Sequence, residues 1–351
     1  MDTPVIAEQP SPVAAPAQRS LVIAPQWIGD AIMTEPLLRR LQARGDTVTV
    51  AALPWVAPVY RAMAAVYEVV EVPFAHGGLQ WGARRAVARQ FKGRFEAAYV
   101  CPNSFKSALV PWWAGIPRRI GYVGESRIGV LTERLPNPTR SLPMVDFYAA
   151  LAGAAPEVDR QPRMQLTVEQ VIGTLATLNL RRNGYFVVAP GAEYGPAKRW
   201  PASHFAALIR SLPLPSVLLG SGKDAEVCAQ IAAAVNGPMP GQCTNLAGKT
   251  SLDQAMNVIA AARSVISNDS GLMHVAAALG VRQVALFGSS SPEHTPPHSP
   301  LAQVVWLKDD RSYQPALDCA PCFKRECPFG HTRCLDDIQP ARVLALLQST
   351  A

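Results

Sequence analysis

The sequence has no run of about 18 uninterrupted apolar residues, the length that a membrane-spanning helix needs. Residues 1–18 are rich in Pro and Ala but lack a basic start followed by an apolar core, so they do not resemble a signal peptide. We interpret them as a disordered tail. The protein is therefore expected to stay in the cytosol, where its seven cysteines should be mostly reduced.

Several motifs that assign common functions are also missing. No helix-turn-helix, zinc-finger or RNP signature is present, which argues against nucleic acid as a partner. The dinucleotide fingerprint G-x-G-x-x-G does not follow the first predicted strand, which argues against an NAD-dependent oxidoreductase. The metal-binding motif Asp-x-Asp does not occur anywhere in the chain.

The charge of the chain is unevenly distributed. The formal net charge is +7. Residues 1–165 contain 18 Lys and Arg against 13 Asp and Glu, whereas the remainder contains 15 against 13. Most of the excess therefore lies in the first half, which predicts an anionic partner there. A phosphorylated small molecule or an anionic lipid headgroup would fit.

Two series of strands and helices follow each other along the chain. The 351 residues are too many for one ordinary core and suit two domains. Short apolar runs alternate with helical patterns, which is typical of parallel α/β sheets. The strand-like runs lie at residues 20–24, 47–53, 69–72 and 97–101, and again at 185–189, 216–219, 264–267 and 283–287.

This pattern predicts an α/β protein of two Rossmann-like, doubly wound domains that face each other across a cleft. We assign residues 19–165 to the first domain, 166–337 to the second and 338–351 to a C-terminal helix. One large α/β domain is the alternative, and the Pro- and Arg-rich stretch at 136–163 argues against it. Ligands should bind outside the carboxyl ends of the strands.

Asp30 lies where the first predicted strand ends and a helix begins. At that position of an open α/β sheet, a carboxylate can act as general base on a substrate hydroxyl. Asp is also a favoured N-cap residue, and spacing alone favours capping over catalysis.

The segment PGAEYGPAKRWP at 190–201 follows a predicted strand and precedes a helix. Small residues such as Gly191 and Ala192 let backbone amides approach a ligand, and Lys198 adds positive charge. Amides beside a helix N-terminus favour a pyrophosphate group. A solvated turn with two ordinary surface cations, Lys198 and Arg199, is the alternative.

A second turn, SNDSG, precedes the helical run LMHVAAALG. The amides of Ser270 and Gly271 could hold a phosphate, and Asp269 could accept hydrogen bonds from sugar hydroxyls. His274 lies in the first helical turn, where it would either approach the ligand or pack into the core. Between the two turns, Asp224 or Glu226 could bind ribose, or both could be surface charges. The loop 289–297 would border the donor site or simply connect elements.

Four cysteines with close spacing lie near the end of the chain, as Cys319-x2-Cys322-x4-Cys327-x6-Cys334. Four thiolates can hold zinc in tetrahedral geometry, in which case the role would be structural. Four reduced thiols in a surface excursion are the alternative.

Five segments together resemble the ADP-heptose:lipopolysaccharide heptosyltransferases, glycosyltransferase family 9. They are LVIAPQWIGDAIM, PNSFKSALVPWWAGIPRRIGY, PGAEYGPAKRWP, NLAGKTSLDQA and NDSGLMHVAAALG. The resemblance runs from about residue 20 to the last helix and is closest to the heptosyltransferase II branch. It implies a GT-B fold, with acceptor binding in the first domain and donor binding in the second.

The resemblance also implies a reaction. L-glycero-D-manno-heptose would pass from ADP-heptose to the first heptose of the lipopolysaccharide inner core, with anomeric inversion and with no required metal or other cofactor. The partners would be ADP-L-glycero-D-manno-heptose and a phosphorylated lipid A-Kdo-heptose acceptor at the inner membrane surface, to which the protein could attach peripherally. We expect a monomer.

By position in these segments, Asp30 matches the family's proposed catalytic base, which overrides the capping interpretation. Lys198 matches the lysine that contacts the pyrophosphate, and Lys106, Arg118 and Arg119 would meet the phosphorylated acceptor unless they form a solvated surface. The remaining expected donor contacts are Gly191, Ala192, Asp269, Ser270, Gly271, His274, then Thr250, Ser251 and Leu252 around the adenine, and Asp224 or Glu226 at the ribose.

Three rival functions remain at this point. Heptosyltransferase I would perform the same chemistry one step earlier, on Kdo-lipid A. An NAD-dependent oxidoreductase is suggested by the doubly wound pattern alone. A non-catalytic sensor of ADP-heptose would keep the donor site and need no base at Asp30.

Overall fold

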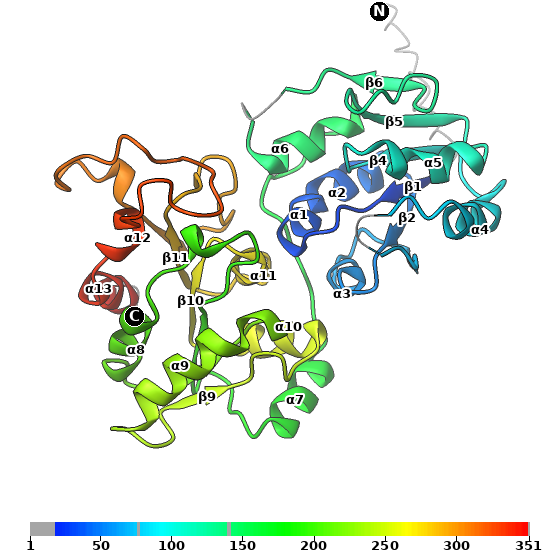
Figure 1. Ribbon diagram of the computed structural model, residues 1–351. Coiled ribbons are helices and arrows are strands. Elements are labelled where there is room, and N and C mark those ends of the chain that lie inside the picture. Colours follow the sequence, from blue (N-terminus) through cyan, green and yellow to red (C-terminus); the bar gives the residue numbers. More distant parts are fainter. Residues whose placement is uncertain (1–17, 76–77, 139–141, 350–351) are drawn as a thin grey trace, which may run out of the picture.

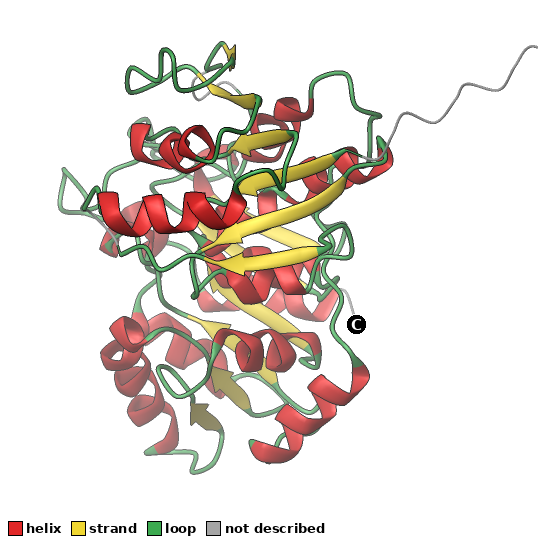
Figure 2. Ribbon diagram, turned by 90° about the vertical axis from the view of Figure 1, so that its right-hand side faces the viewer, coloured by secondary structure: helices red, strands yellow, loops and turns green. Residues whose placement is uncertain are grey.

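The computed structural model describes residues 18–75, 78–138 and 142–349. Two parallel six-stranded sheets lie side by side in it (Figure 1), and helices flank the strands of each (Figure 2). The predicted tail lies outside the described residues, apart from Gln18. In the described part of the chain, no helix has the length and hydrophobicity that a bilayer crossing requires.

The first sheet has the strand order β3-β2-β1-β4-β5-β6. Its central strands are buried on both faces, as expected for a parallel sheet covered by helices. The strands are β1 Arg19–Ile23, β2 Thr47–Ala52, β3 Glu68–Glu71, β4 Ala97–Val100, β5 Arg118–Tyr122 and β6 Glu133–Leu135. The helices are α1 Ile28–Met33, α2 Glu35–Ala43, α3 Ala57–Arg61, α4 Trp81–Phe91, α5 Phe105–Trp113 and α6 Met144–Ala149, with the 3-10 turn η2 Ala150–Ala152.

The second sheet repeats this order as β12-β11-β10-β7-β8-β9. Its strands are β7 Phe186–Ala189, β8 Ser216–Leu218, β9 Cys243–Asn245, β10 Ser264–Asn268, β11 Gln283–Phe287 and β12 Ala302–Trp306. Its helices are α7 Val168–Thr177, α8 Ala202–Arg210, α9 Ala225–Asn236, α10 Leu252–Ala260, α11 Gly271–Ala278, α12 Arg333–Asp336 and α13 Pro340–Ser349. The 3-10 turns are η3 Pro196–Lys198, η4 Gly222–Asp224 and η5 Leu307–Asp309.

The prediction of two successive doubly wound sheets is confirmed, with local differences. The helix expected to begin at Asp30 is divided at Thr34 into α1 and α2, because α2 has a proline in its first turn and the Thr34 hydroxyl donates to the carbonyl of Ala31. Helix α13 packs against α8 and buries Val343 in the second domain's core. The exact domain boundaries stay a prediction.

Each sheet has one point at which the strand order changes direction, between β1 and β4 in the first and between β7 and β10 in the second. Ligands of doubly wound sheets bind at these points, outside the carboxyl ends of the strands. Asp30 follows β1, the segment 190–198 follows β7, and the segment 269–271 follows β10. The topology therefore gathers the segments that the sequence marked as functional.

The first turns of α1 and α11 meet where the two domains join, a region that we call the domain junction (Figure 1). A Cβ atom on Gly271 would lie 2.9 Å from Ile28 Cβ, and one on Gly29 would lie 2.8 Å from His274 Cδ2. Such distances leave no room for a side chain, so glycine is required on both helices. The connecting chain adds backbone hydrogen bonds to both domains, from Met164 N to Ala278 O and from Gln165 N to Ala62 O.

We predict that Gly271→Ala destabilises the folded protein, because the added methyl group would collide with the branched Cβ of Ile28. Overpacking of this kind costs about 1–3 kcal/mol, measured as the free energy of unfolding in urea. Gly173→Ala is the matched control, because Gly173 is an exposed helical glycine with open space around it. It should stabilise by roughly 0.5–1 kcal/mol, and equal effects of the two changes would contradict the prediction.

Candidate active site at the domain junction

Asp30 lies in the first turn of α1, directly after β1, and is partly exposed at the domain junction. The N-cap of α1 is Trp27, and no side chain caps the helix. The capping interpretation of Asp30 is therefore wrong. Its Oδ1 instead accepts a hydrogen bond of 2.9 Å from the hydroxyl of Tyr148, on α6.

The surroundings of Asp30 act on its carboxylate in opposite directions. Burial raises its pKa above the usual value for Asp, because a charged carboxylate is poorly solvated there. The Tyr148 hydrogen bond and the nearby His294 and Lys198 favour the charged form and limit the rise. A carboxylate with a raised pKa is a better proton acceptor, which suits a general base.

The segment after β7 is fastened to the segment after β10 by a buried asparagine. Asn268 donates from Nδ2 to Pro190 O at 2.7 Å, and its Oδ1 accepts from Trp200 N at 3.1 Å. Lys198, carried by η3, forms an ion pair of 2.5 Å with Asp269. The two segments of the expected diphosphate site thus form one unit with a lysine at its centre.

Several hydroxyl groups beside this unit are buried and have no hydrogen-bond partner among the described residues. They belong to Ser270, after β10, and to Ser289 and Ser290, after β11. Buried polar groups are nearly always paired in folded proteins, so unpaired ones at the carboxyl ends of strands are available to a ligand. Burial lowers the pKa of the neighbouring His274 to about 4, so its ring is neutral at physiological pH.

Asp224 is buried, and its carboxylate is hydrogen-bonded within its own turn. Its Oδ2 accepts from the backbone N and the hydroxyl of Ser221, at 2.9 and 2.8 Å. The carboxyl group also fills the space beside Gly191, where a Cβ would lie 2.4 Å from Asp224 Cγ. Glu226 lies two residues later and is exposed. The structure thus gives Asp224 a role in joining two loops and leaves Glu226 accessible.

The segment expected near the adenine lies after β9, at the same edge of the sheet. Ser251 is the N-cap of α10: its hydroxyl accepts from Gln254 N, and Ser251 N donates to Gln254 Oε1. Its side chain therefore has a structural use. Thr250 and Leu252 are partly exposed on either side of it.

Comparison with known proteins identifies the family. The family model described as glycosyltransferase family 9 (heptosyltransferase) matches residues 84–333. Lipopolysaccharide heptosyltransferase 2 of Escherichia coli K12 is 41% identical over 94% of this chain and 97% of its own length. The corresponding protein of Salmonella typhimurium is 40% identical, with the same coverage.

The chain belongs to glycosyltransferase family 9. A solved structure of Escherichia coli ADP-heptose lipopolysaccharide heptosyltransferase II matches it with a TM-score of 0.81 and 39% identity, over 95% of this chain and 100% of that one. The GT-B prediction is thereby confirmed, and the chain is a glycosyltransferase. The oxidoreductase alternative falls away.

Two of the cations expected to contact the acceptor lie far from the domain junction of this family 9 protein. The strand register places Arg118 level with Ala97 and Ser20, at the start of β5 and not at its carboxyl end. Arg118 forms an ion pair with Glu133, and Arg119 donates to Val130 O. The structure therefore does not support Arg118 and Arg119 as acceptor contacts. Lys106, in the first turn of α5, does lie at the carboxyl edge.

The four cysteines lie in a segment that covers the loop carrying Lys198. Ala197 N donates to Arg325 O at 3.0 Å, and the Tyr194 hydroxyl donates to Phe323 O at 2.9 Å. A Cβ on Gly195 would lie 2.5 Å from Arg325 O. Among the described residues, no group of three or more His, Cys, Asp or Glu side chains is arranged to hold a metal ion, so the zinc interpretation gains no support here.

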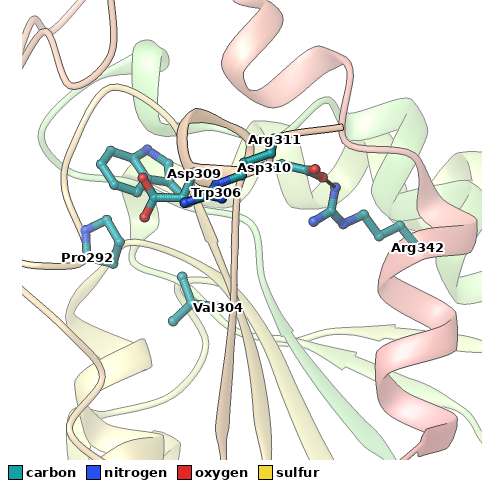
Figure 3. A pocket seen from close by; sticks show the side chains of 7 residues that line it. All are labelled: Pro292, Val304, Trp306, Asp309, Asp310, Arg311 and Arg342. Carbon is teal, nitrogen blue, oxygen red and sulfur yellow. Dashed lines mark hydrogen bonds and ion pairs between the residues drawn. The ribbon is translucent and has the colours of Figure 1, made fainter. Parts of the chain in front are cut away.

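A hollow of about 490 Å³ lies beside β12, away from the predicted site (Figure 3). Its charged lining includes Asp310 and Arg342, which form an ion pair of 2.5 Å. The complete lining is Pro292, Val304, Trp306, Asp309, Asp310, Arg311 and Arg342. None of the residues expected at the site of a family 9 enzyme is among them.

Sequence reasoning missed Tyr148 and His294, two neighbours of Asp30. Tyr148 is 118 positions away from Asp30 in the chain. The loop 289–297 does more than connect strands, because His294 O accepts from Met144 N, and His294 Nδ1 lies 3.2 Å from Leu142 O. No local pattern could have indicated either contact, because Tyr148 reaches Asp30 only through the packing of α6 within the first domain and His294 reaches this region only through the packing of the two domains.

We predict that Lys198→Met lowers the free energy of unfolding by about 3 kcal/mol, because it leaves the carboxylate of Asp269 buried without its cation. Lys223→Met is the matched control, since the Lys223–Glu193 pair is exposed and should contribute less than about 1 kcal/mol. Adding Asp269→Asn to Lys198→Met should recover part of the loss in urea unfolding. Strictly additive effects would show that the two groups are not coupled.

Proposed function

We propose that this family 9 enzyme transfers L-glycero-D-manno-heptose from ADP-heptose to the first heptose of the lipopolysaccharide inner core. One observation carries the proposal. The first sheet brings the carboxylate of Asp30, which can accept a proton, to the domain junction, and the second sheet brings the ammonium group of Lys198 to the same place. Two relatives about 40% identical along nearly the whole chain carry the name lipopolysaccharide heptosyltransferase 2, which favours this acceptor over Kdo-lipid A.

The donor would lie along the carboxyl edge of the second sheet. Lys198 and the amides of Gly191 and Ala192 would neutralise the diphosphate, with the unpaired hydroxyl of Ser270 as a further donor. Glu226, accessible where Asp224 is not, would bind the ribose. The other proposed donor contacts are Asp269, Gly271 and His274 near the sugar diphosphate, and Thr250, Ser251 and Leu252 near the adenine.

In the proposed reaction, the acceptor hydroxyl attacks the anomeric carbon of the heptose from the face opposite to the leaving ADP, so the configuration inverts. Asp30 takes the proton of that hydroxyl as the new bond forms. Negative charge develops on the departing diphosphate, where Lys198 and the loop amides stabilise it. Because these groups supply the positive charge, we propose that the reaction requires no metal ion or cofactor.

The acceptor would approach from the first domain, where Lys106 stands at the carboxyl edge and would meet a phosphate of the lipid A-Kdo-heptose core. A monomer suffices for this arrangement, because the two domains of one chain supply both substrate sites. A non-catalytic ADP-heptose sensor has no use for a carboxylate with a raised pKa at the junction, so catalysis is favoured over sensing.

An aromatic and basic face on α4 and α5 supports peripheral attachment to the inner membrane. We define it by Trp81, Arg85, Arg89, Trp112 and Trp113. Trp81 and Trp112 are 51% and 44% exposed, and the ring centroids of Trp81 and Trp113 are 5.2 Å apart. The α4 sequence contains no acidic residue. Exposed tryptophans beside arginines suit the headgroup region of an anionic bilayer.

We predict that Asp30→Asn lowers kcat for heptosyl transfer at least 100-fold, because the amide cannot accept the proton. Binding of ADP-heptose, measured by calorimetry, should change little. Transfer is measured by mass spectrometry with lipid A-Kdo acceptors that carry either no heptose or one heptose.

The unmodified enzyme should add heptose only to the acceptor that already carries one. Addition to Kdo alone would identify the first-step enzyme instead. If Asp30→Asn transfers heptose at the normal rate, Asp30 is not the base, and if neither acceptor is modified while ADP-heptose still binds, the sensor alternative returns.

We predict that the protein sediments with vesicles of phosphatidylglycerol and phosphatidylethanolamine more than with vesicles of phosphatidylcholine alone. Trp81→Ala combined with Arg85→Gln should weaken this association about tenfold, through loss of one interfacial ring and one positive charge. Tyr67→Ala is the control, because Tyr67 is a more exposed aromatic residue elsewhere on the first domain. A loss of similar size in the control would contradict the assignment of this face.

A further inference from the structure

Tyr148 is a buried tyrosine whose hydroxyl donates a hydrogen bond of 2.9 Å to Oδ1 of Asp30. Within the described part of the chain, no other side chain donates a hydrogen bond to this carboxylate. The bond joins α6, at the end of the first domain, to the helix that follows β1. It therefore acts on the group to which the proposed reaction assigns proton transfer.

The position of Tyr148 is fixed from several sides. Its ring packs edge-on against Phe147, with centroids 5.4 Å apart, and Phe147 in turn stacks on Tyr122 at 4.1 Å. The first turn of α6 is held by the second domain, through the hydrogen bond of 2.9 Å from Met144 N to His294 O. A side chain held in this way can fix the orientation of another, because little freedom remains for it to lose.

We propose that Tyr148 is a positioning residue of the transfer reaction, an inference that rests on the proposed role of Asp30 as base. The phenol holds Oδ1 and thereby sets the rotation of the carboxylate. Oδ2 then points its free lone pairs at the acceptor hydroxyl. Proton transfer requires such a fixed geometry within hydrogen-bond distance.

The same hydrogen bond stabilises the carboxylate form of Asp30. The other groups that face Asp30 or the adjoining Gly29 come from five segments. They are Tyr60 on α3, Cys101 after β4, Lys198 on η3 and His294 after β11, with His274 on α11 against the adjoining Gly29. Burial raises the pKa of the tyrosines and of Cys101, and it lowers that of His274, so these groups are uncharged at neutral pH.

The experiment compares Tyr148→Phe with the unmodified full-length enzyme in heptosyl transfer across a range of pH. The substitution keeps the ring and removes only the donor. Activity requires the carboxylate, so it is lost as pH falls through the pKa of Asp30. Without the donor that pKa rises, and we expect the acid limb of kcat to move up by about one pH unit. At the optimum, kcat should fall roughly tenfold, with KM for ADP-heptose unchanged.

Tyr185→Phe serves as the matched control, because Tyr185 is a buried tyrosine whose hydroxyl donates to Val258 O at 2.7 Å in the second domain. It loses one comparable hydrogen bond and should leave the pH profile unchanged. In addition, Tyr148→Phe should have no further effect on the residual rate of Asp30→Asn, since the two side chains act through one proton transfer.

A normal pH profile and kcat for Tyr148→Phe would overturn the inference, as would a shift of the same size in Tyr185→Phe. These results are distinguishable from failure of the proposed function. That failure would appear as an Asp30→Asn variant with full transfer activity, whatever Tyr148→Phe does. A thermal unfolding midpoint measured for each variant separates a loss of folding from a loss of positioning.

Discussion

The packing of α1 against α11 is the constraint on which the rest of this molecule depends. Parallel sheets present functional groups at their carboxyl ends, so two such sheets can serve one reaction only if those ends face each other closely. Here Gly29 leaves room for the ring of His274 and Gly271 leaves room for the side chain of Ile28, so the first turns of the two helices can approach closely. Asp30 on one domain and Asp269 on the other are thereby carried to the same region as Lys198.

Two carboxylates at the domain junction, Asp30 and Asp269, interact with the same lysine. Lys198 pairs with Asp269 and also lies near enough to Asp30 to favour its charged form. Under the proposed reaction, a bound diphosphate would draw on the same lysine. Its negative charge would weaken the support that Lys198 gives the carboxylate, which would raise the proton affinity of Asp30 when donor and acceptor are both present. The neutral His274 adds no competing charge.

Much of the fold was predictable from the sequence because buried parallel strands are short, continuous apolar runs. Short polar strands such as β6, with the sequence ERL, were missed. Their residues form no apolar run, and only the pairing with β5 makes the segment a strand. The segments after β1, β7 and β10 were predictable as site segments, because topology sends the chain past the same edge at each one.

Side-chain partners were not predictable. The contact between Tyr148 and Asp30 depends on tertiary packing across 118 positions. Arg118 and Arg119 lie within one of the five segments that resemble the family, yet they begin a strand instead of ending one. Their position along β5 therefore sets them at the wrong edge of the sheet. The sequence could not decide whether Asp224 or Glu226 contacts the ribose, because the hydrogen bond between Ser221 and Asp224 is seen only in the folded turn.

The cysteine-bearing segment that covers the loop around Tyr194 and Lys198 has a thermodynamic consequence. Ordering a flexible backbone costs roughly 1–2 kcal/mol per residue. Here the hydrogen bonds to Phe323 and Arg325, together with the close approach at Gly195, order this loop while the domain folds. Under the proposed function, a diphosphate would bind a loop that is already ordered, so the entropy of ordering it would not be subtracted from the affinity.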